Sequence, residues 1–297
     1  MFLQTGKRPY TNVRTFNKIF SSHPNNLLVA PNTLVTPESI TMKNRATSLS
    51  RSLFAVLLCG LAARGISAPT LDQLVAQNIE ARGGAAALEA MKSLKIQGKL
   101  LIQDGQYELF YVQTVRRPAS IRTEATIQGL TQVQAFDGTT GWQINPFQGR
   151  KDPERLSSDD LKSLIETVAD FDGALVDWRK KGNKLEYLGT EDIDGTLAHK
   201  IKLTRPGGDT EYVYLDPDHF LEIRLSSQRT EHGVLVETET DLGDYEKIDG
   251  VFIPFSVESG LKGSSDRQKL IVNKADVNAK TDDAWFAFPL APLKLKH

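Results

Sequence analysis

Acidic and histidine side chains are the first candidates for chemistry in this chain, and they gather in three short clusters. Asp216-Pro-Asp-His219 could hold a cation, and Asp192-Ile-Asp-Gly195 copies a fragment of a calcium loop. Asp282-Asp283 could serve as an acid and a base. Each cluster also matches a turn or a cap, because Asp side chains accept hydrogen bonds from nearby backbone amides. We therefore predict two turns and a cap, and no metal site.

Other signatures of an enzyme are missing from the sequence. It contains no nucleophile elbow, no phosphate-binding glycine loop and no zinc-spaced set of His and Cys. Beyond residue 67 the histidines are scattered: His199, His219, His232 and His297. We therefore expect no catalytic residue, no cofactor and a function other than catalysis. An uncharacterised hydrolase is the weaker alternative.

Charge is divided unevenly along the 297 residues. Residues 1–67 hold eight basic residues and one acid, whereas residues 68–297 hold 28 basic and 36 acidic residues. The composition, 40% hydrophobic and 25% charged, is that of a globular protein and excludes disorder and collagen. Because an acidic body repels polyphosphate, nucleic acid is not an expected partner.

A secretory signal explains the basic N-terminal part. Met42-Lys-Asn-Arg begins a basic region, residues 53–63 are apolar, and small residues follow up to Ala68. The apolar run is roughly half the length of a membrane-spanning helix. We expect a cleavable signal peptide at 42–67 and a periplasmic location. Cys59, the single cysteine, lies inside the apolar run, so the exported part would suit an oxidising compartment.

Residues 1–41 precede this signal and are interpreted as a non-native upstream extension without a fold. A transit peptide is the alternative, since the stretch is basic, hydroxyl-rich and poor in acids. Residues 68–297 are predicted to form a single ligand-binding domain.

The sequence after residue 68 is predicted to be mainly β with a few helices. Helical spacing runs from Leu71 to Ile79 and from Ala85 to Met91, interrupted by Gly83-Gly84. Alternating runs then follow, separated by turn dipeptides such as Asp104-Gly105 and Asp137-Gly138, which indicates hairpin-linked antiparallel strands. The predicted strands are 94–103, 107–116, 119–128, 130–136, 140–144, 184–191, 196–204, 209–215, 220–230, 234–247, 251–258 and 267–277.

One internal helix could cover the sheet. Ser158 or Asp159 would cap its start, and apolar residues follow at offsets of three and four up to Phe171. Leu175 and Trp178 could extend this cover beyond Gly173. Arg179-Lys180-Lys181 is interpreted as a solvated helix end, although an acidic partner could dock there.

Alternation within the strands predicts one apolar and one polar face. Ile121, Ala125 and Ile127 alternate with Arg122 and Glu124. A curved sheet lined with aliphatic side chains under a helix encloses either a packed core or an apolar cavity, and hydropathy alone does not decide between them. Trp142 and Trp285 could likewise be core residues or ligand platforms.

Several motifs resemble one known family. Val115-Arg-Arg-Pro-Ala-Ser-Ile-Arg precedes Ala135-Phe-Asp-Gly-Thr-Thr-Gly-Trp-Gln-Ile-Asn-Pro-Phe, and the later part contains Asp244-Tyr-Glu-Lys-Ile-Asp-Gly-Val-Phe-Ile-Pro254, Val277-Asn278 and Trp285-Phe-Ala-Phe-Pro289. Their order and spacing, over about residues 70–292, resemble the LolA-like periplasmic outer-membrane lipoprotein-sorting family of lipoprotein carriers. The double glycine at 83–84 and the section after Asn183 depart from a dedicated carrier.

The resemblance implies a large curved antiparallel sheet that forms an open half-barrel of about eleven strands under an α-helical lid. Its ligands would be acyl chains of a lipoprotein or another lipid, received from an inner-membrane donor and given to an outer-membrane acceptor. A periplasmic sensor with the same lipid-binding fold is the alternative. Arg117 would hold the lid closed, and Ile121 would lie at the mouth. The predicted cavity and lid residues are Ile121, Ala125, Ile127, Trp142, Leu161, Leu164, Ile165, Val168, Phe171, Leu221 and Ile223.

Overall fold

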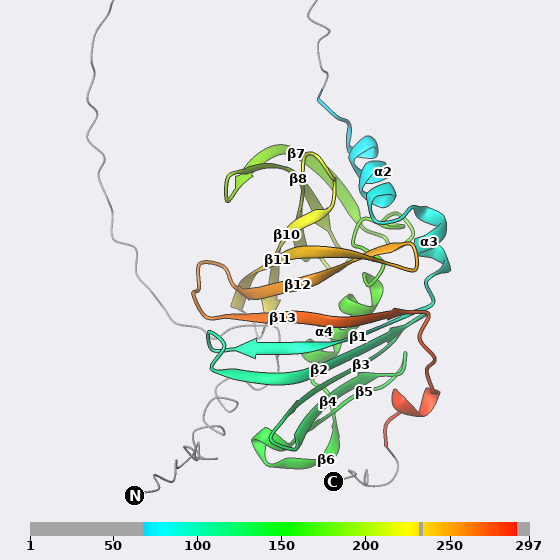
Figure 1. Cartoon of the computed structure of the whole chain (residues 1–297), viewed down its shortest axis with the longest axis vertical. Helices are drawn as coiled ribbons and strands as arrows, with labels where there is room; N and C mark the ends of the chain where they lie inside the picture. The colour runs from blue at the N-terminus through cyan, green and yellow to red at the C-terminus, as the bar shows by residue number, and fades with distance from the viewer. Residues whose placement is uncertain (1–67, 232–233, 290–297) are drawn as a thin grey trace, which may run out of the picture.

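One antiparallel sheet dominates the computed structural model, which describes residues 68–231 and 234–289 (Figure 1). Its 13 strands are β1 (Ser93–Ile102), β2 (Tyr107–Arg116), β3 (Ser120–Ile127), β4 (Leu130–Phe136), β5 (Gly141–Asn145), β6 (Arg150–Arg155), β7 (Lys184–Ile193), β8 (Thr196–Thr204), β9 (Thr210–Leu215), β10 (Glu222–Glu231), β11 (Val234–Ile248), β12 (Val251–Leu261) and β13 (Arg267–Val277). They are ordered β6-β5-β4-β3-β2-β1-β13-β12-β11-β10-β9-β8-β7. The sheet is curved and open, because its edge strands β6 and β7 do not pair, which confirms the predicted fold class.

Hairpins connect almost all neighbouring strands, and β1 and β13 close the middle of the sheet by pairing across the length of the chain. The twelve predicted strands are all present. The edge strand β6 was not predicted, because its sequence Arg-Lys-Asp-Pro-Glu-Arg is charged and contains a proline. An edge position tolerates both features, since one side of the strand faces solvent.

Within residues 68–231 and 234–289, three α-helices and two short 3₁₀ turns accompany the sheet. They are α2 (Leu71–Ala81), α3 (Ala85–Ala90), α4 (Ser158–Ala169), η1 (Pro146–Gln148) and η2 (Asp283–Trp285). A capping box between Thr70 and Gln73 starts α2. Within the described residues no helix combines the length and apolar character needed to cross a membrane.

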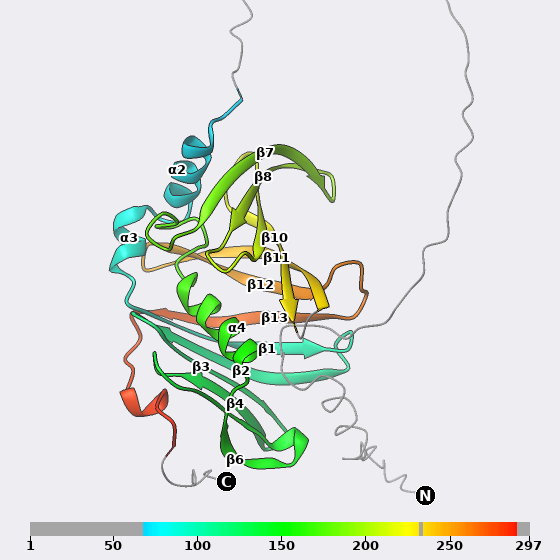
Figure 2. The same ribbon diagram turned by 180° about the vertical axis from the view of Figure 1, so that it is seen from behind.

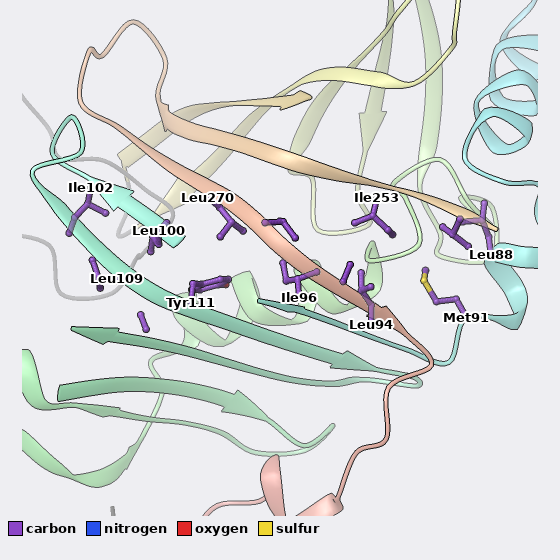
Figure 3. Packing of buried hydrophobic residues seen from close by; sticks show 14 residues of the cluster. Leu88, Met91, Leu94, Ile96, Leu100, Ile102, Leu109, Tyr111, Ile253 and Leu270 are labelled. Carbon is purple, nitrogen blue, oxygen red and sulfur yellow. The ribbon is translucent and has the colours of Figure 1, made fainter. Parts of the chain in front are cut away.

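The centre of the concave face is apolar. Side chains of β1, β2, β12 and β13 pack together there, and Leu88 and Met91 close the cluster at the α3 end (Figure 3). Leu100, Leu109 and Leu270 represent the strands. Burial of such aliphatic side chains stabilises the fold by about 1.5–3 kcal/mol each. This cluster is the part of the interior that matches the predicted aliphatic lining.

Helix α2 covers the other end of the sheet. Leu74 and Val75 pack against Ile201 and Val213 of β8 and β9, together with Leu175 from the segment after α4. The predicted extension of the cover by Leu175 and Trp178 is confirmed as packing, but the segment consists of turns rather than helix.

The segment around η2 covers the convex face of β4 and β5. Trp142 donates a hydrogen bond from Nε1 to the carbonyl of Phe286 at 2.7 Å, and its ring meets Phe288 edge to face. Asp282 caps η2 by accepting from the amide of Ala284, as predicted. Both faces of β5 are therefore buried, and the expectation of one wet face is wrong for this strand.

Helix α4 lies over the middle of the sheet, on the face turned away from the viewer in Figure 1 and toward the viewer in Figure 2. Its N-cap is Ser157, whose side chain accepts from the amide of Asp160, rather than Ser158 or Asp159. Leu164 and Val168 are buried against Val115 and Ile121.

Gly98 is required where β1 bends against β13. A Cβ atom at this position would lie 2.2 Å from the carbonyl oxygen of Ile271, at the register shift between Gln97 and Gly98. We predict that Gly98→Ala lowers the free energy of unfolding by about 1–3 kcal/mol, because the backbone of β13 must move. Urea denaturation measures this change.

The matched control is Gly243→Ala in β11, where a Cβ atom would meet nothing within 4 Å. We expect this change to stay within about 1 kcal/mol of the wild type. Equal losses in both variants would contradict the assignment of a close backbone contact to Gly98.

Candidate ligand cavity

A cavity of about 350 Å³ lies between α4 and part of the concave face of the sheet. Strands β2, β3 and β4 form one wall, and β10, β11 and β12 form the other. Arg205 and Glu211 close the end near β8 and β9. The volume lies within the range of about 300–1,000 Å³ typical of small-molecule sites.

Two of the predicted residues line this cavity directly, namely Ile121 from β3 and Leu164 from α4. Val168, Leu161 and Phe171 belong to the apolar cluster that seats α4 on the sheet beside it. The other two predicted β3 residues, Ala125 and Ile127, belong to the central apolar cluster.

Four predicted residues lie away from the cavity, namely Ile165, Trp142, Ile223 and Leu221. Ile165 is 42% exposed and faces a separate groove with Pro206 and Gly207 on the outer side of α4. Trp142 is buried on the convex face. Ile223 occupies a register shift between Glu222 and Arg224, so it packs on a cluster with Ile193 and Tyr214.

The cavity-lining residue of β10 is Leu225, two positions beyond this irregularity. Leu221, also predicted, precedes β10 and is partly exposed. Its carbonyl accepts a hydrogen bond from the amide of Asp216, so it belongs to the turn before the strand.

Most of the residues that line the cavity have polar side chains, which sequence reasoning missed. Gln113 and Gln134 come from β2 and β4, and hydroxyl residues such as Thr240 and Ser259 come from β11 and β12. Aliphatic residues are therefore a minority of the residues that line this part of the concave face. A signal was present in β4, where Gln132 and Gln134 alternate with Val133 and the other residues of the convex cluster.

Helix α4 presents acids to the cavity. Glu166 has its pKa raised by burial, an effect that the nearby cations Arg205, Lys162 and Arg229 partly oppose. Asp160 is buried and accepts a hydrogen bond from the Ser157 hydroxyl at 2.5 Å. The cavity side of α4 is therefore mixed in character, apolar at Leu164 and acidic beside it.

Arg205 joins the end of α4 to the sheet. Its guanidinium donates to Asp170, the C-cap of α4, at 2.7 Å and to Glu211 of β9 at 2.6 Å. Burial opposes the charge on Arg205, but these two carboxylates outweigh it and raise its pKa. Burial raises the pKa of Glu211, with Arg205 acting in the opposite direction.

Arg117, just after β2, contacts the residue that follows α3 and the turn segment that follows α4. Its Nη2 donates to Oδ2 of Asp172 at 2.6 Å, and its Nε donates to the carbonyl of Met91 at 2.9 Å. The guanidinium also stacks 5.0 Å from the centre of the Phe171 ring. Arg117 thus ties the strand end of β2 to the backbone after α3 and to the segment after α4.

Lys181 binds the same two carboxylates as Arg117 and Arg205. Its ammonium donates to Asp172 at 3.0 Å and to Asp170 at 3.1 Å. We call the chain Arg117, Asp172, Lys181, Asp170, Arg205 and Glu211 the α4 network. Lys181 is only 18% exposed, so its interpretation as part of a solvated helix end is wrong.

The two predicted turn clusters are confirmed as turns. Asp216 accepts from the amides of Asp218 and His219, and Asp192 accepts from the amide of Gly195. Among the residues that the structure describes, no group of three His, Cys, Asp or Glu side chains is placed to hold a metal ion.

An open antiparallel half-barrel with a helix over its concave face defines the fold class of this chain, and solved structures are similar to it. No family model and no curated protein matches the chain. A structure described as an outer membrane lipoprotein-sorting protein domain from Vibrio parahaemolyticus matches with a TM-score of 0.50 and 13% identity, over 71% of this chain and 94% of that one. A LolA superfamily protein from Nitrosomonas europaea matches with a TM-score of 0.50 and 14% identity, over 74% and 98%. The chain therefore has a LolA-like fold, as the motifs indicated.

We predict that Arg117→Leu destabilises the protein by about 2 kcal/mol in urea denaturation. Removal of one partner leaves the carboxylate of Asp172, which is 2% exposed, with less compensation. The loss stays below that of a fully buried pair, because Arg117 is 35% exposed and Lys181 remains. In an Asp172→Asn background the same substitution should cost about 1 kcal/mol less.

Arg179→Leu is the matched control, since its ion pair with Asp72 is exposed on both sides and should contribute under about 1 kcal/mol. Additive effects of the Arg117 and Asp172 changes would contradict direct coupling through the α4 network.

We predict that Glu166→Gln raises the melting temperature at pH 7 but not at pH 4. Because burial raises the folded-state pKa above 4.5, the native state binds more protons than the unfolded state, and stability falls as pH rises through that range. Glutamine removes this loss. The exposed Glu186 provides the control variant Glu186→Gln, and a gain that is equal at both pH values would argue against burial as the cause.

Proposed function

We propose that the protein is a periplasmic carrier or binding protein for hydrophobic ligands, with lipoprotein acyl chains as the leading candidate. The observation that carries this proposal is the cavity of about 350 Å³ between α4 and the concave face. It adjoins the apolar cluster of Leu100, Leu109 and Leu270, against which hydrocarbon can pack. The LolA-like fold supports the same function by analogy with its structural neighbours.

The physics of such a carrier rests on exchange of apolar contacts. Each methylene moved from water to an apolar site gains about 0.8 kcal/mol. Leu164 and Val168 of α4 pack on Ile121 and Val115, and an acyl chain could replace those contacts at little net cost. The ligand would then shift α4 outward, while the α4 network keeps its C-terminal end attached at Asp170 and Asp172.

The same proposal includes export by a signal peptide, a single binding domain, and transfer of the ligand between membrane partners. The proposed signal peptide at 42–67 and the upstream extension at 1–41 lie outside the described residues. The proposed binding domain, residues 68–297, would receive its cargo from an inner-membrane donor and release it to an outer-membrane acceptor. Release would need a competing apolar site rather than a chemical step.

Two adjacent residues of α4 test the proposal with a fluorescent fatty-acyl probe. We predict that Leu164→Asp weakens probe binding by at least about tenfold, because a carboxylate at the cavity surface is costly beside hydrocarbon. Ile165→Asp should leave binding within about twofold, because Ile165 faces the outer side of the same helix. Fluorescence titration measures both.

Circular dichroism and urea denaturation establish that the two variants fold. Equal effects at positions 164 and 165, or full binding by a folded Leu164→Asp variant, would place the probe outside the space beneath α4. An unmodified protein that binds no acyl probe would contradict the proposed function itself.

A further inference from the structure

Residues with polar side chains outnumber apolar residues along the cavity wall. Of its 20 lining residues, five are aliphatic or aromatic without charge, namely Tyr111, Ile121, Leu164, Leu225 and Val257. The other fifteen carry hydroxyl, amide, carboxylate or guanidinium groups. A bare acyl chain would leave these groups without partners from the ligand, and buried polar groups are stabilised by hydrogen bonds.

Two pairs of hydroxyl side chains bridge neighbouring strands on this wall. Ser227 bonds to Thr238 at 2.5 Å, and Thr240 bonds to Ser259 at 2.7 Å. Each pair contains two O–H donors and four lone pairs, and the bond between its members uses one of each. Each pair therefore keeps one donor and three acceptor positions for a ligand in the cavity.

Amide side chains supply the facing wall. Gln113 accepts from the Tyr111 hydroxyl at 2.9 Å through Oε1, so its NH₂ group is the part left for a ligand. Gln132, on the same face of β4 as Gln134, is 4% exposed and its Oε1 has no hydrogen-bond partner. Hydrogen-bond donors and acceptors therefore face the cavity from both walls, β2 and β4 on one side and β10, β11 and β12 on the other.

The charged side chains of the cavity limit which headgroup a ligand can carry. Four carboxylates line the cavity, those of Asp160, Glu166, Asp170 and Glu211, against the two guanidiniums of Arg205 and Arg229. An anionic headgroup would add charge to a site that already has an acidic excess. A cationic headgroup gains little from Asp170 and Glu211, since Arg205 already bonds to both.

We propose that the cavity selects amphiphiles with an uncharged, hydroxyl-bearing headgroup, such as a glyceride or a glycosyl lipid. This inference rests on the proposed function, because it assumes that hydrocarbon enters the same site. The headgroup hydroxyls bond to the Thr240 and Ser259 pair and to Gln113, and the chain lies along Leu225 and Val257. Anionic lipids of equal chain length bind more weakly.

Four lauroyl or dodecyl compounds test the inference by displacement of the fluorescent acyl probe below their micelle concentrations. They are 1-monolauroylglycerol, laurate, dodecyltrimethylammonium and methyl laurate. We expect monolauroylglycerol to bind about tenfold more tightly than laurate or the ammonium compound at pH 7. In Thr240→Val/Ser259→Ala, its affinity should fall about five- to tenfold, while that of methyl laurate stays unchanged.

Thr126→Val/Thr131→Val is the matched control. These two threonines form a hydroxyl pair at 2.9 Å between β3 and β4, on the opposite face of the sheet from Thr123. We expect the control variant to bind all four compounds as the wild type does.

Each outcome separates the inference from the proposed function. Tighter binding of laurate or of the ammonium compound, or an equal loss for methyl laurate in the Thr240→Val/Ser259→Ala variant, would overturn headgroup selection and leave a carrier of acyl chains. Absence of any binding by the acyl probe would overturn both.

Discussion

The attachment of α4 to the sheet depends on two carboxylates that follow the helix, the half-buried Asp170 and the buried Asp172. Asp170 and Asp172 are held by cations from both sides of the half-barrel, Arg117 at the end of β2 and Arg205 at the end of β8, with Lys181 between them. Breaking a buried pair is costly, because the remaining charge stays in a medium of low dielectric constant. The end of α4 is therefore fixed by charge, whereas its middle rests on interchangeable aliphatic contacts. In the proposed function, this difference would let α4 move without detaching from the sheet.

The cavity combines an apolar centre with polar walls, and this combination distinguishes it from a simple container for hydrocarbon. Leu225 and Val257 continue the apolar cluster of the central strands, while Thr240 and Gln113 supply hydrogen-bonding groups on opposite sides. The acids of α4, with Glu166 destabilised by burial, add a preference against negative charge. A ligand that satisfies the whole surface must be amphiphilic.

Local patterns in the sequence predicted the strands and helices, but not which side chains line the cavity. Turn dipeptides and period-two alternation fix each strand by itself, and the motifs around Arg117 and Trp142 indicated the fold. Which face of each strand lies inside depends on cover from distant segments. Phe286 and Phe288 cover the convex side of Trp142. The neighbouring apolar residues Val133, Ala135 and Ile144 point to the same outer face, and the glutamines of β4 and β5 point inward. A local register shift also moves Ile223 away from the cavity.

Helical spacing placed Leu164 on the buried stripe of α4, whereas Ile165, at the border of that stripe, faces the outer side of the helix. The role of Lys181 depends on partners nine and eleven residues away in a turn segment, which no periodicity reveals.

In the proposed function, the ligand occupies the space beneath α4. Methyl NMR with a nitroxide-labelled monoacylglycerol locates the ligand directly, because the unpaired electron broadens only nearby signals. We predict selective broadening of the Leu164, Leu225 and Val257 methyl signals, with those of the exposed Leu197 of β8 unaffected. Broadening at Leu197 while the cavity methyl signals stay sharp would contradict binding of the ligand beneath α4.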